Sequence, residues 1–167
     1  MYINNKLYEE KARESIVDEL YKHWALYYPA PEAIQVEYDI DMLCVRRPTA
    51  DNPVVRLETV EEKYVRSAEH PCCLIEIIQN QNLNSPGWIK VSIADWLMYS
   101  YDCDDYRACY WVSLPALRKK TFDDYIYRYK KANVLRSDCN PYNIAVPWTV
   151  IKKDIGYTRV VITKKGA

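Results

Sequence analysis

One stretch of this sequence constrains the fold more than any other. It is VVRLETVEEKYV, residues 54–65, in which the alternating pattern of a strand ends in three consecutive charges. Side chains two residues apart on a strand lie on the same face. Leu57, Thr59, Glu61 and Lys63 therefore share a face that begins apolar and ends in a carboxylate and an ammonium group. Either this strand runs out into solvent, or its charges meet partners inside the molecule.

Two further apolar segments carry an isolated acid. Asp41 lies in the predicted strand 34–45, and Glu76 lies in the predicted strand 72–78. Burying an unpaired charge costs several kcal/mol, so each acid either pairs locally with an arginine, lies at a strand end, or joins a site. Carboxylates that converge on one point favour a hard divalent cation. A lysine beside such an ion can orient water or stabilise the charge that develops on a phosphate.

The remaining pattern predicts an α+β or α/β protein. Residues 54–65 and 34–45 are expected to form an antiparallel hairpin. Helices are predicted over 6–26, from Ser92 and from Pro115, and further strands over 106–114, 145–151 and 157–163. The helix at Ser92 rests on a capping-box spacing with Asp95. We expect a single domain with a central mixed sheet flanked by helices.

Composition excludes several functional classes. The chain has 3 glycines and neither a GxGxxG nor a GxxxxGK[ST] motif, which excludes nucleotide-binding loops of those kinds. The first residues are too charged for a signal peptide and no apolar run approaches a membrane span. We therefore expect a cytoplasmic, intracellular protein without a membrane partner. Its 6 cysteines are expected to be reduced, buried thiols, because no CxxC or CxxH spacing supports a zinc site.

The net charge is zero, but the charges are unevenly distributed. Residues 1–100 hold 10 Lys+Arg and 16 Asp+Glu, whereas residues 101–167 hold 13 and 7. An acidic first part and a basic second part fit a protein that holds a cation and contacts a polyanion. The basic run also fits a solvated helix face. The candidate phosphate contacts are Lys90, Arg118, Lys119, Lys120, Arg128, Lys130 and Lys131.

Taken in order, these segments resemble the PD-(D/E)XK nuclease superfamily, in particular its small phage-type resolvase-like members. DIDML around Asp41 is similar to the metal-binding aspartate at a strand start, and EEK at 61–63 is similar to the ExK element. CLIEI around Glu76 resembles the hydrophobic strand with a glutamate that often follows. SPGWIKVSIADWLMYSY (85–101) and YWVSLPALRKK (110–120) resemble the later helix, strand and basic segment. The resemblance covers about residues 6–131.

The resemblance implies a restriction-endonuclease-like domain over residues 1–167, from a phage or its bacterial host. Asp41 and Glu61 would hold Mg²⁺ or Mn²⁺ with help from Glu76, and Lys63 would position the attacking water. The implied reaction is hydrolysis of DNA phosphodiester bonds, with branched DNA as the candidate substrate. The resemblance also implies a homodimer, since resolvase-like enzymes cut two strands symmetrically.

Several alternatives remain open. Glu58 competes with Glu61 for the ExK position, and that register would lose the lysine. Asp39 can substitute for Asp41, and Glu9 can correspond to a helix-one glutamate of some family members. A non-catalytic interaction or inhibitor protein on a degenerate nuclease fold fits the neutral charge. A small adaptor without nucleic acid predicts that Glu61 and Lys63 are exposed and far from Asp41.

Overall fold

The computed structural model describes residues 11–14, 17–22, 24–46, 48–50, 53–132 and 140–164. Its strands are β1 Trp24–Pro29, β2 Met42–Arg46, β3 Leu57–Val65, β4 Cys72–Asn80, β5 Ser85–Pro86, β6 Trp96–Asp102, β7 Tyr106–Ser113, β8 Lys131–Ala132, β9 Tyr142–Pro147 and β10 Thr158–Thr163. Its helices are α2 Val17–Tyr21, α3 Glu32–Tyr38, α4 Trp88–Val91, α5 Leu114–Lys120, α6 Ile126–Arg128 and α7 Trp148–Asp154, with a π-helix at Thr121–Tyr125.

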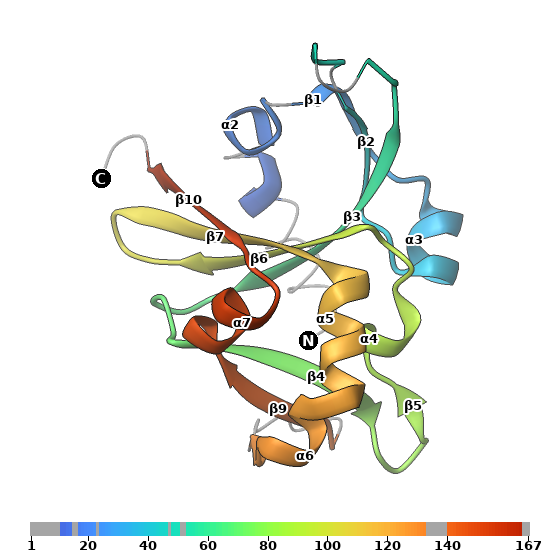
Figure 1. Cartoon of the computed structure of the whole chain (residues 1–167), viewed down its shortest axis with the longest axis vertical. Helices are drawn as coiled ribbons and strands as arrows, with labels where there is room; N and C mark the ends of the chain where they lie inside the picture. The colour runs from blue at the N-terminus through green and yellow to red at the C-terminus, as the bar shows by residue number, and fades with distance from the viewer. Residues whose placement is uncertain are drawn as a thin grey trace.

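The strands form two sheets flanked by helices (Figure 1). The larger sheet has the order β1-β2-β3-β6-β7-β10 and is mixed, because only β3 and β6 pair in parallel. The smaller sheet, β5-β4-β9-β8, is antiparallel. The predicted mixed α/β architecture and the antiparallel hairpin of β2 and β3 are thus confirmed. The restriction-endonuclease-like topology stays a prediction.

The parallel pairing places two strands of the smaller sheet, β4 and β5, inside a crossover. Between β3 and β6 the chain runs through β4, β5 and α4 before it returns to the larger sheet. Figure 1 shows β4 and β9 below the larger sheet, with α5 alongside both. The side chains between the sheets form one hydrophobic cluster, which includes Ile75 of β4, Ile144 of β9, Leu97 of β6 and Leu117 of α5.

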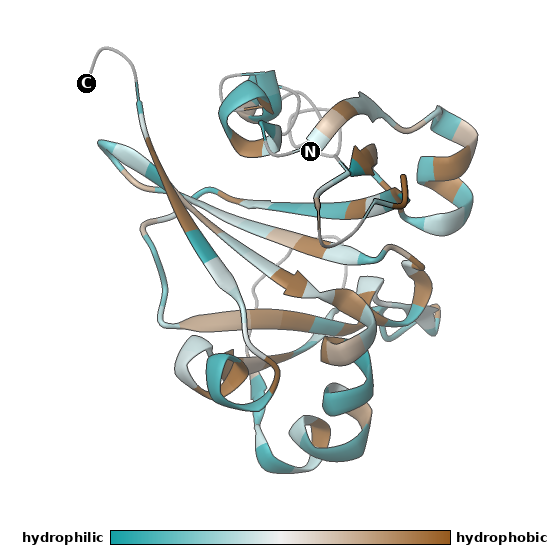
Figure 2. Ribbon diagram, turned by 45° about the horizontal axis from the view of Figure 1, so that its top comes forward, coloured by the Kyte–Doolittle hydropathy of each residue, from teal (hydrophilic) through white to brown (hydrophobic). Residues whose placement is uncertain are grey.

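A second hydrophobic cluster covers the opposite face of the larger sheet. Leu20 and Tyr21 of α2 pack there against Met42, Val60 and Met98. The hydropathy colours of Figure 2 show apolar residues on the strands between these layers. The middle of β3 is therefore covered on both faces. This explains why Glu61 and Glu62, which point to opposite faces, are both buried.

The predicted strand 34–45 is wrong in its first half, which is helix α3. Pro31 precedes α3 in an extended conformation (φ −53°, ψ 145°), and Asp39 ends it in the left-handed region (φ 51°, ψ 53°). Proline stands well at a helix start, and a left-handed residue is a common helix terminator. None of the α3 side chains is buried, so its sequence does not show apolar residues at helical spacing. Without that spacing the segment resembled a strand.

The helix predicted from Ser92 is also wrong, because α4 ends before it and β6 follows. The Ser92 hydroxyl donates to the carbonyl of Asp39 at 2.7 Å and accepts the Ala94 N–H at 3.3 Å. The Asp95 carboxylate accepts the backbone N–H of Thr59 at 2.9 Å. Both side chains of the apparent capping box therefore connect the loop to other segments.

Two other boundaries differ from the prediction. Residues 24–26, predicted as helix, belong to β1, and residues 148–151, predicted as strand, belong to α7. The helix predicted over 6–26 is present at residues 11–14 and in α2, while 1–10, 15–16 and 23 lie outside the described residues. No helix in the described part of the chain is long and apolar enough to cross a membrane.

Candidate functional site

The site forms where β2 begins beside the middle of β3. The N–H of Asp41 donates to the carbonyl of Val60 at 2.8 Å, and Asp41 Oδ2 accepts the N–H of Glu62 at 2.7 Å. Asp41 is thus fixed to β3 through its backbone and through its side chain. Its side chain remains 25% exposed, so its carboxylate stays accessible from outside.

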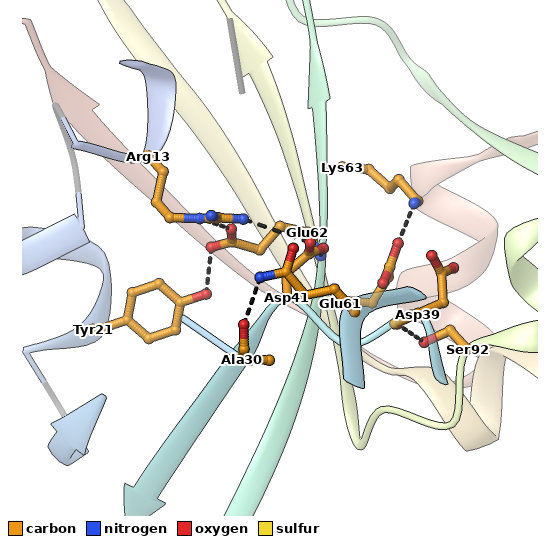
Figure 3. A network of polar contacts seen from close by, with 10 residues as sticks. Arg13, Tyr21, Ala30, Asp39, Asp41, Glu61, Glu62, Lys63 and Ser92 are labelled. Atoms are coloured by element: carbon orange, nitrogen blue, oxygen red, sulfur yellow. Dashed lines mark hydrogen bonds and ion pairs between the residues drawn. The ribbon is translucent and has the colours of Figure 1, made fainter. Parts of the chain in front are cut away.

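One face of β3 carries Glu61 and Lys63 as the strand alternation predicts. Their side chains form an ion pair. The Glu61 side chain is 1% exposed and that of Lys63 is 29% exposed, so the ammonium group lies above a covered carboxylate. Lys63 Nζ also lies 5.9 Å from the ring centroid of Trp88, a cation–π distance. The Asp39 side chain lies beside that of Glu61 (Figure 3).

The other face of β3 carries Glu62, whose carboxylate is completely buried. Arg13 Nε and the Tyr21 hydroxyl donate to its two oxygens, both at 2.5 Å. Arg13 Nη2 also lies 3.6 Å from Asp41 Oδ1. Figure 3 shows Asp41 between the two groups, with Glu62, Arg13 and Tyr21 on one side. Lys63, Glu61 and Asp39 lie on the other side.

Burial shifts the pKa values of three acids of the site upward. Burial raises the pKa of Glu61 well above its ordinary value, and the attraction of Lys63 opposes this only in part. Burial likewise raises the pKa of Asp39, and that of Glu62 despite the guanidinium of Arg13. Burial alone would lower the pKa of Lys63, but Glu61, Asp39 and Asp41 together raise it. The lysine is therefore a fixed cation.

Glu61 is left without a complete set of partners. Its Oε1 pairs with Lys63, but neither of its buried oxygens accepts a well-formed hydrogen bond from a described residue. The neighbouring Asp39 supplies a second carboxyl oxygen instead of a donor. Two neighbouring carboxyl groups are ionised together only when a cation lies beside them, and Lys63 supplies that cation here. The carboxylate oxygens of Asp39 and Glu61 are also the kind of ligand that Mg²⁺ and Mn²⁺ prefer.

The structure brings together three of the four candidate site residues. Asp41 raises the pKa values of both Glu61 and Lys63, and Glu61 and Lys63 form an ion pair. Glu76 of β4 lies in the smaller sheet, on the face opposite to the buried Ile75 and Ile77. The strand alternation therefore turns Glu76 away from the inter-sheet core, and its part in the site stays a prediction.

The alternative residues have other roles. Glu58 lies on the opposite face of β3 from Glu61 and binds Arg46 at 2.8 and 2.9 Å, while Trp96 Nε1 donates to it at 3.1 Å. Asp39 lies beside Glu61, although on the loop after α3 and not on a strand. Glu9 lies outside the described residues.

Four of the predicted phosphate contacts are engaged by other groups of the protein, and three are exposed lysines. Arg118 donates to the carbonyls of Ile89 and Ser92, so its guanidinium group is used inside the fold. Three others pair with acids: Lys119 with Asp123, Lys120 with Asp124 and Asp154, and Arg128 with Asp124. Lys90, Lys130 and Lys131 are exposed, and Lys131 Nζ lies 5.8 Å from the ring centroid of Tyr142.

No preassembled metal cage is present in the described part of the chain. No group of three or more His, Cys, Asp or Glu side chains there is arranged to hold a metal ion. The cysteines at 44, 72, 73, 103 and 109 are free thiols. The carboxylates of the site therefore need to move relative to Lys63 and Arg13 before they can surround an ion.

Sequence reasoning missed the second half of the site. Arg13 and Tyr21 come from the first helical segments, and together they compensate the buried Glu62. The available signal was the pair of adjacent acids at 61 and 62, because two consecutive strand residues point to opposite faces. A strand with charges on both faces requires cationic or donor groups on both sides if it is central to a sheet.

Comparison with protein-family models, with curated proteins and with solved structures found no match for this chain.

Proposed function

We propose that this protein is a divalent-metal-dependent endonuclease that hydrolyses DNA phosphodiester bonds. The observation that carries the proposal is the buried Glu61 carboxylate, which pairs with Lys63 beside Asp39 and Asp41 where β2 begins next to β3 (Figure 3). Several carboxylates gathered in one covered site favour a bound cation near neutral pH. Lys63, whose side chain is 29% exposed, supplies the group that such chemistry needs.

Each residue of the site would have a distinct role. Asp41, Glu61 and Asp39 would hold Mg²⁺ or Mn²⁺, and Asp39 would take the ligand role that was predicted for Glu76 from the sequence. When bound, the ion would activate water and stabilise charge on the phosphate. Lys63, a fixed cation that reaches the surface, would orient the water and attract the scissile phosphate.

Arg13 would act behind the site rather than in it. It shares its charge between Glu62 and Asp41. Through these contacts it holds Asp41 against β3.

The DNA contacts would come from the exposed lysines. The candidates are Lys90, Lys130 and Lys131, which are exposed and are not among the ion pairs with acids described above. Arg118, which donates to backbone carbonyls, would support the loop before β6 instead. Branched DNA and a homodimeric enzyme remain the proposed substrate and assembly.

A second candidate is a non-catalytic interaction protein that retains the same site. Arg13 and Lys63 already lie against the carboxylates that a metal would need, and the chain has no net charge. In that case the cluster would serve stability alone. An adaptor with exposed surface pairs is not favoured, because Glu61 is buried and close to Asp41.

The test is cleavage of branched and linear DNA with Mg²⁺ or Mn²⁺. It compares the wild type with Lys63→Ala, Asp41→Ala and the control Glu58→Gln, which changes a carboxylate on the other face of β3. We expect metal-dependent cutting that the first two variants abolish and the control retains. Absence of cutting, together with no Mn²⁺ binding by calorimetry, would replace the nuclease by the non-catalytic candidate.

A further inference from the structure

A cavity of about 630 Å³ lies beyond the end of β3, away from the candidate nuclease site. Its walls come from three places that are distant in sequence. These are the loop before β4, the turn between β6 and β7 with the start of β7, and the start of α7 with the segment before β10. The volume falls in the range of small-molecule sites. None of its described lining residues belongs to the site around Asp41.

One wall of the cavity is aromatic and rigid. The rings of Tyr110 and Trp148 stack at 4.0 Å with an interplanar angle of 11°, and Tyr157 packs edge-on against both. Trp148 Nε1 donates to the Tyr101 hydroxyl at 3.1 Å. These contacts hold the ring planes in place, so the wall is formed before any ligand arrives. Tyr106 adds a fourth ring at the rim.

The polar lining of the cavity is acidic. Glu69, Asp104 and Asp105 line it together with His70, and its described lining contains neither lysine nor arginine. Glu69 is fully engaged, because Arg159 binds it through two hydrogen bonds of 2.6 and 2.7 Å. Those bonds lower the pKa of Glu69. Asp104 and Asp105 are exposed, and neither forms an ion pair with a described residue.

The same wall already accommodates cations of this chain. The Arg159 guanidinium carbon lies 6.0 Å from the Tyr110 ring centroid, and Lys152 Nζ lies 5.8 Å from that of Tyr157. Both distances are typical of cation–π contacts. Arg159 pairs with Glu69. Asp104 and Asp105 are therefore the carboxylates of the lining without a cationic partner among the described residues.

We propose that this cavity binds an organic cation, an alkylammonium or guanidinium group attached to an apolar or flat stem. The stem lies against Tyr106 and Tyr157, the part-exposed rings of a wall in which Tyr110 and Trp148 are buried, and the cationic end pairs with Asp104 and Asp105. Such a group exists both in free polyamine-like molecules and in the lysine or arginine side chains of a protein partner. The chemistry of recognition is the same for both sources.

The test is titration of the full chain with agmatine and with N-acetyl-Gly-Arg-Gly-amide. The uncharged controls are N-butylurea, which carries neither cationic group of agmatine, and the citrulline peptide. Binding is followed by NMR at the indole N–H of Trp148, because the Trp148 ring is part of the cavity lining. We expect saturable shifts with the cations only, weakened by added salt because the contact is electrostatic. Tighter binding of the peptide would identify a protein side chain as the ligand, and tighter binding of agmatine a free amine.

The variant Asp104→Asn/Asp105→Asn removes both uncompensated charges, and its matched control is Glu32→Gln/Glu37→Gln on exposed α3. Exposed ion pairs contribute about 0.2–1 kcal/mol each, so losing two weakens binding about twofold to 25-fold. Tyr106→Leu supplies a second variant, expected to weaken binding about twofold to fivefold. Equal binding of the uncharged compounds, or equal affinity of the aspartate variant and its control, would overturn the proposal.

Discussion

The most informative perturbation is at Glu62, the buried acid on the far face of β3. Glu62→Gln keeps the shape and the hydrogen bond from Tyr21 but removes the charge that Arg13 compensates. Breaking a buried pair costs about 3–5 kcal/mol, because the remaining charge is left without its partner. Arg13 is 17% exposed and lies 3.6 Å from Asp41. We therefore expect a smaller loss, about 2–4 kcal/mol in the free energy of unfolding.

The complementary change, Arg13→Met, leaves a different residue unpaired. Burial raises the pKa of Glu62, so the folded protein can respond by protonating this acid. Such an acid contributes stability that is present at low pH and lost as the pH rises through its folded pKa. The cost of Arg13→Met should therefore grow as the pH rises from the ordinary pKa of a glutamate, about 4.3, towards the raised pKa of Glu62 in the folded protein. The cost of Glu62→Gln should change much less over that interval.

The double variant separates the pair from its surroundings. If Arg13 and Glu62 compensate each other, the double change costs less than the sum of the single changes by about 2 kcal/mol. Urea unfolding at several pH values measures this, with the slope of the transition used to verify two-state behaviour. Costs that add within about 0.5 kcal/mol would refute the pairing. A pH-independent cost of Arg13→Met would refute the protonation of Glu62.

Three further predictions follow from single contacts. Wild-type stability should fall as the pH rises above about 5, because burial raises the pKa of Glu61 and an acid with a raised pKa favours the folded state only while it is protonated. Glu61→Gln should flatten this pH dependence in thermal unfolding. Added Mn²⁺ should raise the wild-type Tm more at high pH than at low pH. Gly87→Ala should destabilise by at least about 1–3 kcal/mol in urea unfolding, since its Cβ would lie 2.2 Å from the carbonyl oxygen of Glu76. Ser92→Ala should cost about 1–3 kcal/mol by the same measurement, because the buried hydroxyl donates to Asp39; no loss would show that this bond does not hold the loop.

The sequence predicted the parts of the fold in which strand alternation is visible. β3, β4, β7 and β10 appear within a few residues of their predicted ranges, because their apolar residues face a core. Helix α3 was missed because none of its side chains is buried. Short solvent-exposed helices are set by their ends, here Pro31 and Asp39, rather than by a hydrophobic period.

The candidate site was predictable to the extent that local spacing decides it. Alternation on β3 placed Glu61 and Lys63 together, and this holds in the structure. The position of Glu76 depends on which sheet contains β4, and sequence spacing does not determine that. Asp39 joins the site only because a left-handed residue turns the chain after α3. Its contribution depends on backbone conformation that a strand prediction could not contain.

The parallel pairing of β3 and β6 also has a consequence for how fast the protein can fold. Residues 60–65 align with residues 96–101, so the central pairing of the larger sheet closes a loop of about thirty residues that contains β4. Pairings between distant residues form late and slow the folding reaction. We expect β2–β3 and β6–β7, which are hairpins, to form first. The β2–β3 and β6–β7 hairpins would then pair through β3 and β6 only when β4 lies outside the larger sheet. Until these hairpins pair, Glu61 and Glu62 both remain exposed to water.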